Sequence, residues 1–439
     1  MSNITSWLPK VCGGLTMSKI LTITEKQSQK ISYWHLAAFL ATLPFDIFYN
    51  ELVLLSFIIH TLIHCRVNSW KKLLNVKVYL IAAIFLLGCI TLFYSPDKNE
   101  GVNILTRQSA FLIFPVVFCL SDFDWEANQV KLLRVFAITC AVVILYLFAD
   151  ALYTLRYFHL PLSDLFTLAF MNHNFSMPIG IHATYLSMYA AFSIVICTRL
   201  LFSEPEKKQR VLYITLIIIL AAGLLQLSSR AVFIALLLIV NSCFPLFLYP
   251  AGKRLRFSII TLLLSLGILL LIFSVDVFKV RYVNELQKDL SGKIALIENN
   301  EPRMARWKLI FGLIKKSPVT GYGIGAEKKL LKEQYFEHQL YSSYLNEFNT
   351  HNEYLSCLLK AGIPGLLLFL VLLFLGLREA FRRKDLHFAS LMVLLGVVAV
   401  SENVLDLNKG IFFFAFFLSF FLLQGRQKAL PAVPGRQPN

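Results

Sequence analysis

The sequence predicts an all-α polytopic membrane protein with about twelve transmembrane helices and one large, mostly helical external loop. Its composition is the first observation that supports this class, because 57% of the 439 residues are hydrophobic and only 15% are charged. A soluble domain has about 25% charged residues. The second observation is that the apolar residues gather in runs close to the roughly 20 residues that a membrane-spanning helix needs.

The apolar runs divide the chain around a single long polar stretch. They lie near 32–48, 51–65, 77–94, 104–121, 133–153, 181–203, 211–227, 231–249, 257–275, 361–377, 388–404 and 410–424. We therefore expect a lead and nine helices in residues 1–275, an external loop carrying the functional residues in 276–360, three helices in 361–425, and a tail in 426–439.

The distribution of basic residues predicts the orientation. One set of connections, near 66–77, 131–134, 199–210, 253–256, 378–384 and 426–428, is rich in Lys and Arg, whereas the alternating set is poor in them. Short cytoplasmic loops carry an excess of Lys and Arg. Both termini are accordingly expected in the cytoplasm, with residues 276–360 on the opposite side.

Several function classes are disfavoured by composition. The formal charge of +16 follows from the short basic connections and does not indicate nucleic-acid binding. The eight cysteines are scattered and form no CxxC or Cys/His pattern, so we expect no metal site. A transporter or proton pump would be expected to carry charges deep within its spans, and few are found there.

The segment from Arg303 to Lys316 is predicted to be a helix with one wide apolar face. At about 100° per residue, Arg303 falls near the centre of that face and Arg306 at its edge. A charge among apolar residues is unfavourable unless it reaches solvent at the helix end or meets an anion. Both alternatives stay open for Arg303, and its planar guanidinium suits a phosphate.

The residues after this helix give weaker signals. Gly321, Gly323 and Gly325 are spaced as in some phosphate-binding loops, but no GK[ST] motif follows, so a turn that ends the helix is the simpler interpretation. Residues 327–348 are charged and are expected to form a helical, solvated cover.

Thr350 to Glu353 fits a capping box, with Thr350 as the N-cap and His351 and Asn352 in the first turn. The positive end of the helix dipole disfavours a charged imidazole there, so His351 is a candidate proton acceptor. A surface histidine without a role is the commoner case, and the case for His351 rests on nearby arginines.

Further candidates lie at the external ends of other spans. Arg230 lies in a very short external connection, where Arg is less expected. A connection this short holds the arginine at the level of the lipid headgroups. Arg281 is a weaker candidate of the same kind, and His182 and Tyr185 are candidates to line the same groove. Asp406 lies in a late external connection.

Together, these residues resemble a known family over roughly residues 220–375. Ser229-Arg230 before a span, Arg303 with Trp307, Pro318 with Gly321 and Gly323, and His351-Asn352 before Gly362 look like the O-antigen ligase and polymerase superfamily. The resemblance implies a C-type membrane glycosyltransferase fold and no cofactor. It implies His351 as the catalytic base and Arg230, Arg303 and, less closely, Arg281 as diphosphate ligands. Asp406 matches the family's late acidic position poorly.

The resemblance to the ligase branch also implies the substrates. An undecaprenyl diphosphate-linked glycan would be the donor and lipid A–core oligosaccharide the acceptor. Transfer would be metal-independent and inverting, and would take place at the periplasmic face of a Gram-negative inner membrane, among membrane lipids and without nucleic acid. An O-antigen polymerase, which uses a lipid-linked repeat as acceptor, is the open alternative. A non-enzymatic transporter of lipid-linked sugar is less favoured, because few charges lie within the spans.

Overall fold

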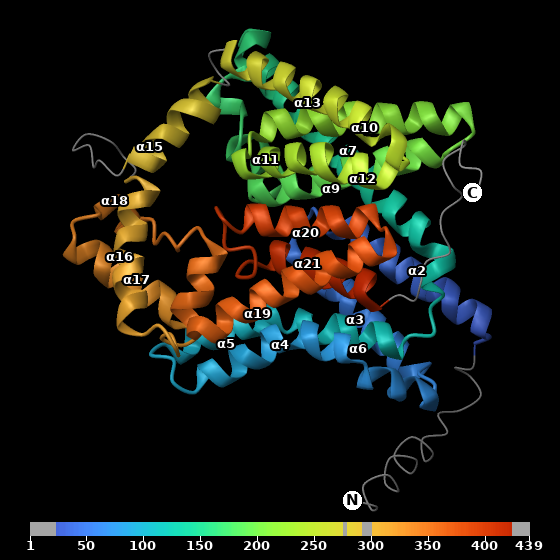
Figure 1. Cartoon of the computed structure of the whole chain (residues 1–439), viewed down its shortest axis with the longest axis horizontal. Coiled ribbons are helices and arrows are strands. Elements are labelled where there is room, and N and C mark those ends of the chain that lie inside the picture. The colour runs from blue at the N-terminus through green and yellow to red at the C-terminus, as the bar shows by residue number, and fades with distance from the viewer. Residues whose placement is uncertain (1–22, 275–278, 292–300, 424–439) are drawn as a thin grey trace, which may run out of the picture.

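The computed structural model describes residues 23–274, 279–291 and 301–423, which form helices and turns and contain no strand. The helices of the main bundle are α2 (Glu25–Thr42), α3 (Ile47–Ile63), α4 (Val76–Leu92), α5 (Lys98–Gln108), α6 (Ala110–Leu120), α7 (Trp125–Tyr157), α9 (Ala183–Ser203), α10 (Lys207–Leu227), α11 (Arg230–Leu238), α12 (Phe244–Leu248), α13 (Ala251–Ser274), α19 (Glu353–Arg383), α20 (Leu386–Val398) and α21 (Asn408–Leu423). Three further helices, α16 (Arg303–Lys316), α17 (Ala326–Glu337) and α18 (Tyr341–Leu345), gather at one end of the bundle (Figure 1).

Short helical segments connect these elements. They are η1 (Val67–Leu74), η2 (Leu162–Phe166), η3 (Leu168–Phe170), α8 (His173–Ser176), η4 (Met177–Ile179), η5 (Ile239–Cys243), η6 (Val280–Asn284) and α15 (Glu285–Ser291). Each of the twelve apolar runs coincides with one or more helices. Six continuous helical stretches within the described residues are long and apolar enough to cross a membrane, which is consistent with a polytopic membrane protein. The count of twelve spans and the limits of the external loop stay predictions.

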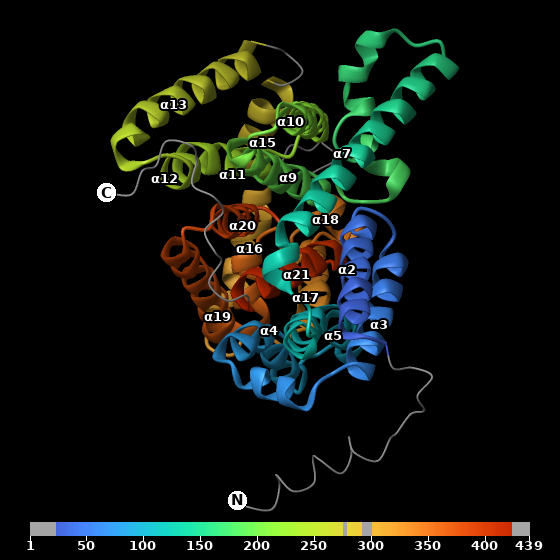
Figure 2. The same cartoon turned by 90° about the vertical axis from the view of Figure 1, so that its right-hand side faces the viewer.

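The bundle is layered, with α20 and α21 between a group made of α9 to α13 and a group made of α2 to α6 (Figure 2). Helix α21 is buried on all sides, and its phenylalanines stack with one another and with rings from neighbouring helices; Phe416, for example, stacks on Phe39 at 5.2 Å. A helix that is apolar all round is expected at such a central position. Large apolar side chains on α3 and α13 are exposed instead, as lipid-facing residues would be.

Helix α19 is broken at Gly362, whose φ of 63° and ψ of −155° are not helical. Pro364 follows and has no N–H to donate to the carbonyl of Lys360. The glycine-rich loop, residues 321–325, supplies the missing donors. The N–H of Tyr322 donates to the Leu359 carbonyl at 2.8 Å, and the N–H of Gly323 donates to the Lys360 carbonyl at 2.9 Å. The loop does follow the end of α16, as predicted, but it also stabilises the break in α19, which the turn prediction did not include.

The three outer helices enclose a small apolar core of their own. The predicted helix over 303–316 is confirmed as α16, and it packs with α17 and the start of α19 around Ile310, Leu331, Tyr335 and Leu359. The helices expected over 327–348 are observed as α17 and α18 with exposed outer residues, but their inner face is buried rather than solvated. Glu327 in α17 is itself only 4% exposed.

Candidate functional site

A cavity of about 460 Å³ lies between the end of the bundle and helices α15 and α16. Its lining comes from α8, the starts of α9, α11 and α16, the middle of α15, the residue before α19, and the end of α20 with the connection that follows. The lining residues are Asn172, His173, His182, Thr184, Ser229, Arg230, Ala231, Ile234, Leu286, Asp289, Leu290, Arg303, Trp307, His351, Gly396, Val397, Val400, Ser401 and Glu402. Three of the predicted functional residues, Arg230, Arg303 and His351, are thus brought together.

Arg230 is fixed by a tight turn between two helices. Ser228 ends α10 with a left-handed φ of 48°, and Arg230 is the first residue of α11. Ser229 is the N-cap residue, but its side chain makes no capping hydrogen bond. The guanidinium of Arg230 lies 2.7 Å, through Nη2, from Oδ2 of Asp289, while its buried Nη1 has no hydrogen-bond partner within the described residues.

Arg303 is the first residue of α16 and turns toward the same cavity. Its Nη1 donates to the carbonyl of Ser401 at 3.2 Å, and its Nε lies 3.8 Å from Oδ2 of Asp289. Of the two alternatives for Arg303, the cavity-facing one is therefore observed. Two arginines from distant parts of the chain share a single carboxylate, which concentrates positive charge beside the cavity.

His351 does not lie in the first turn of α19, as the capping-box prediction had it. The N-cap is Asn352, whose Oδ1 accepts from the N–H of Leu355 at 3.1 Å, and the helix begins at Glu353. His351 precedes the cap with a left-handed φ of 45°. The helix-dipole argument for His351 therefore loses its geometric basis. The imidazole instead lies beside a carboxylate, because Nδ1 of His351 is 3.5 Å from Oε2 of Glu402.

Glu402 was not singled out from the sequence, although it lies in the connection between α20 and α21. Its other oxygen lies 3.4 Å from Oγ1 of Thr184. Burial by itself would raise the pKa of the Glu402 carboxyl, but its interactions with His351, His182 and Arg303 outweigh burial and lower the pKa to about 2. Glu402 is thus a carboxylate at neutral pH.

Two further histidines line the cavity beside Thr184. The rings of His173 and His182 lie 4.0 Å apart between centroids. Burial lowers the pKa of His182 to about 4, so its imidazole is neutral at physiological pH. The expectation that His182 lines the groove is met. Tyr185 does not line the cavity: it is buried, and its hydroxyl donates to the carbonyl of Asn403 at 3.1 Å.

A buried polar network beneath the cavity fixes the segment that carries His351. Oδ1 of Asn403 accepts hydrogen bonds from the Thr350 hydroxyl at 2.8 Å and from the Asn352 N–H at 2.9 Å. The side-chain amide of Asn403 donates to Oε1 of Glu327, which also accepts from the N–H of Thr350. Asn352 is therefore a structural residue here and does not line the cavity.

Asp406 belongs to the same network. It lies 2.6 Å from Nζ of Lys360, which is also 3.1 Å from Glu327. The prediction that Asp406 contributes to the site is not supported by its position, because its carboxylate is used by a buried cation outside the cavity lining. The acidic residue of this connection that reaches the cavity is Glu402.

Arg306 and Arg281 are the alternatives for a third diphosphate ligand. Arg306 is buried 4.9 Å from the centroid of the Phe348 ring and is absent from the cavity lining. Burial lowers its pKa. Arg281 has its backbone in η6, and its side chain lies outside the described residues. Within the part of the chain described, no group of three or more His, Cys, Asp or Glu side chains could hold a metal ion.

Comparison with known proteins adds two findings. Residues 214–370 match a family model described as O-antigen ligase, and this range includes Arg230, Arg303 and His351. An uncharacterized protein of Haemophilus influenzae is 22% identical over 245 residues, which are 53% of this chain and 61% of that relative. The chain thus matches less than two thirds of the relative's length.

Proposed function

Because the chain belongs to the O-antigen ligase/polymerase superfamily, we propose that it transfers an O-antigen glycan from undecaprenyl diphosphate to a terminal sugar of lipid A–core oligosaccharide. The observation that carries this proposal is the cavity that Arg230, Arg303 and the His351–Glu402 pair line together. Such a site offers cations for an anionic leaving group and a base for an attacking hydroxyl. We place the reaction at the periplasmic face of a Gram-negative inner membrane.

Arg230 and Arg303 are the proposed ligands of the donor diphosphate. Guanidinium groups bind phosphate oxygens through pairs of N–H donors, and they stabilise the negative charge that grows as the sugar–phosphate bond breaks. The unpartnered Nη1 of Arg230 supports this assignment, since a buried donor without a partner is costly unless a ligand completes it. Arg281 remains a candidate for a third contact.

His351 is the proposed general base. The acceptor hydroxyl oxygen attacks the anomeric carbon on the face opposite the diphosphate, forming the glycosidic bond as the bond from that carbon to the phosphate oxygen breaks. The hydroxyl proton passes to Nε2 of His351, and the bonding electrons leave with the diphosphate. The Glu402 carboxylate near Nδ1 favours the tautomer with its proton on Nδ1 and stabilises the imidazolium that forms.

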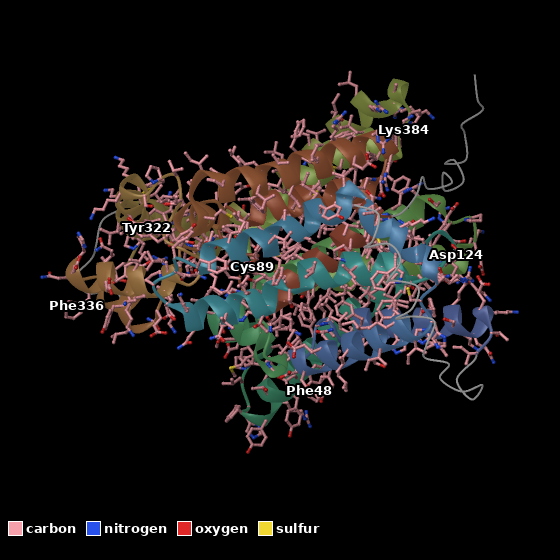
Figure 3. All side chains as sticks on the ribbon, turned by 90° about the horizontal axis from the view of Figure 1, so that it is seen from below. Phe48, Cys89, Asp124, Tyr322, Phe336 and Lys384 are labelled. Carbon is pink, nitrogen blue, oxygen red and sulfur yellow. The ribbon has the colours of Figure 1, made fainter. Side chains whose placement is uncertain are left out.

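The proposed orientation rests on the ends of the bundle. Figure 3 shows Tyr322 and Phe336, from the outer helices, at one end and Lys384 and Asp124 at the other. Lys384 belongs to one of the strongly basic connections, which are typical of the cytoplasmic side. The cavity lies toward the end of Tyr322 and Phe336, in agreement with a periplasmic reaction and cytoplasmic termini.

A polymerase reaction would use the same chemistry with a lipid-linked repeat as acceptor, so the acceptor must be tested directly. Purified protein is mixed with undecaprenyl diphosphate-linked glycan and either lipid A–core or a second portion of donor, with and without EDTA. We expect glycosylated lipid A–core in the first mixture, unaffected by EDTA, as the proposed inverting, metal-independent displacement requires. Lengthened donor without glycosylated lipid A–core would instead identify a polymerase.

A further inference from the structure

Helix α15 places a carboxylate where the proposed function needs a phosphate. Asp289 is the one acidic residue that α15 contributes to the cavity lining, and its Oδ2 lies 2.7 Å from Nη2 of Arg230 and 3.8 Å from Nε of Arg303. We propose that Asp289 is a specificity-determining residue of the donor site: its carboxylate occupies the position of a donor phosphate and is exchanged for the diphosphate when the donor binds. This inference rests on the proposed function.

The charges around the cavity favour such an exchange. Arg230 and Arg303 contribute two positive charges to the lining, and Asp289 and Glu402 contribute two negative ones. A diphosphate added beside an undisturbed Asp289 would place at least two more anionic charges among partly buried groups, where like charges repel strongly. Removal of the Asp289 carboxylate from the arginines leaves both guanidinium groups for the ligand.

The position of Asp289 suits a group that yields to a ligand. Helix α15 is short and lies beside the start of α16 at the margin of the bundle, as Figure 1 shows, and its main packing partners in the described chain are α16 and η6. The Asp289 side chain is 25% exposed, whereas that of Glu402, which pairs with His351, is 12% exposed. The less buried carboxylate is the one whose rehydration costs less.

The exchange gives the site a preference among anions. A ligand with one negative charge gains little binding free energy, because it must displace a carboxylate that already interacts with both arginines. A diphosphate brings more charge and more acceptor oxygens than the aspartate that it replaces, and it can engage both guanidinium forks at once. Asp289 therefore lowers the affinity of the site for every anion, but it lowers the affinity for a monophosphate relatively more than that for a diphosphate.

The test is binding of inorganic pyrophosphate and inorganic phosphate to the purified full chain in detergent, by calorimetry, with the wild type and Asp289→Asn. We expect Asp289→Asn to bind pyrophosphate about tenfold more tightly, which corresponds to about 1.4 kcal/mol. The affinity for phosphate should rise by a larger factor than this, so that the preference for pyrophosphate over phosphate narrows. Glu285→Gln removes a carboxylate from the same helix outside the cavity lining and should leave both affinities unchanged.

Two further variants separate the possible outcomes. Asp289→Glu keeps the charge and should bind pyrophosphate within about threefold of the wild type, which shows that any gain in Asp289→Asn comes from lost charge. Arg230→Gln should weaken pyrophosphate binding. Equal or weaker binding by Asp289→Asn, with weakening by Arg230→Gln, overturns the inference and leaves the proposed function standing. Wild-type binding that Arg230→Gln and Arg303→Gln leave unchanged contradicts both.

Discussion

Replacement of Glu402 by Gln tests the pairing of the base with its carboxylate most specifically. The substitution keeps the size of the side chain and removes its charge 3.5 Å from Nδ1 of His351. At that separation two unit charges interact by about 5 kcal/mol in an effective dielectric of about 20. Because the proton is only partly transferred in the transition state, we expect roughly 2 kcal/mol of this to be lost, or about a 30-fold lower kcat.

The pH–rate profile tests the charge state of Glu402. The pKa of the Glu402 carboxyl is lowered to about 2, so Glu402 stays ionised throughout pH 5–8 and contributes no titration there. Any fall in rate in Glu402→Gln within this range should therefore reflect the loss of the carboxylate charge and not the titration of residue 402.

The assay is initial-rate transfer of glycan to lipid A–core between pH 5 and 8, at saturating donor. Glu402→Asp should recover part of the rate, and Glu51→Gln, which removes an exposed carboxylate from α3, should match the wild type. A lower rate accompanied by a lower thermal midpoint would mean that Glu402 acts through folding. A rate equal to that of the wild type would refute the pairing altogether.

Three further predictions concern the arginines and the segments that support them. Arg303→Gln should reduce kcat/KM for the donor by about 10²–10³-fold, as loss of one stabilising donor does elsewhere, while Lys308→Gln on the exposed side of α16 should not. Lys360→Met should lower the thermal midpoint in detergent, since Glu327 and Asp406 lose their buried cation, at a cost of about 3–5 kcal/mol; an unchanged midpoint would exclude this role. Gly321→Ala should destabilise the protein by about 1–3 kcal/mol from backbone strain alone, because φ at this position is 64°. The added Cβ would also lie 2.7 Å from the backbone of α19. A variant as stable as the wild type would contradict this tight fit.

Local patterns in the sequence were enough to predict several elements and residues. The period of apolar residues predicted α16 with its observed bounds. Short motifs singled out Arg230, Arg303 and His351, which line one cavity in the structure. These features depend on residues that are near one another in the chain. For the same reason, the break in α19 could be expected from Gly362 and Pro364.

Long-range contacts account for what the sequence did not reveal. The start of α19 was misplaced because Thr350 bonds Asn403 rather than capping the helix, and this partner is 53 residues away. Glu402 and Asp406 are both acidic residues of one connection, and only the packing of α20, α21 and the His351 segment decides which one faces the cavity. Asp289 gave no local signal, since its partner Arg230 lies 59 residues earlier.

The central claim, that His351 activates an acceptor hydroxyl beside a diphosphate held by arginines, is tested most directly by single-turnover transfer with His351→Ala. At saturating donor and acceptor, we expect the transfer rate to fall by about 10²–10⁴-fold, the usual contribution of a general base. Pyrophosphate binding should stay within about threefold of the wild type, because both arginines remain. Transfer at a near-wild-type rate by a stably folded His351→Ala protein would contradict the account.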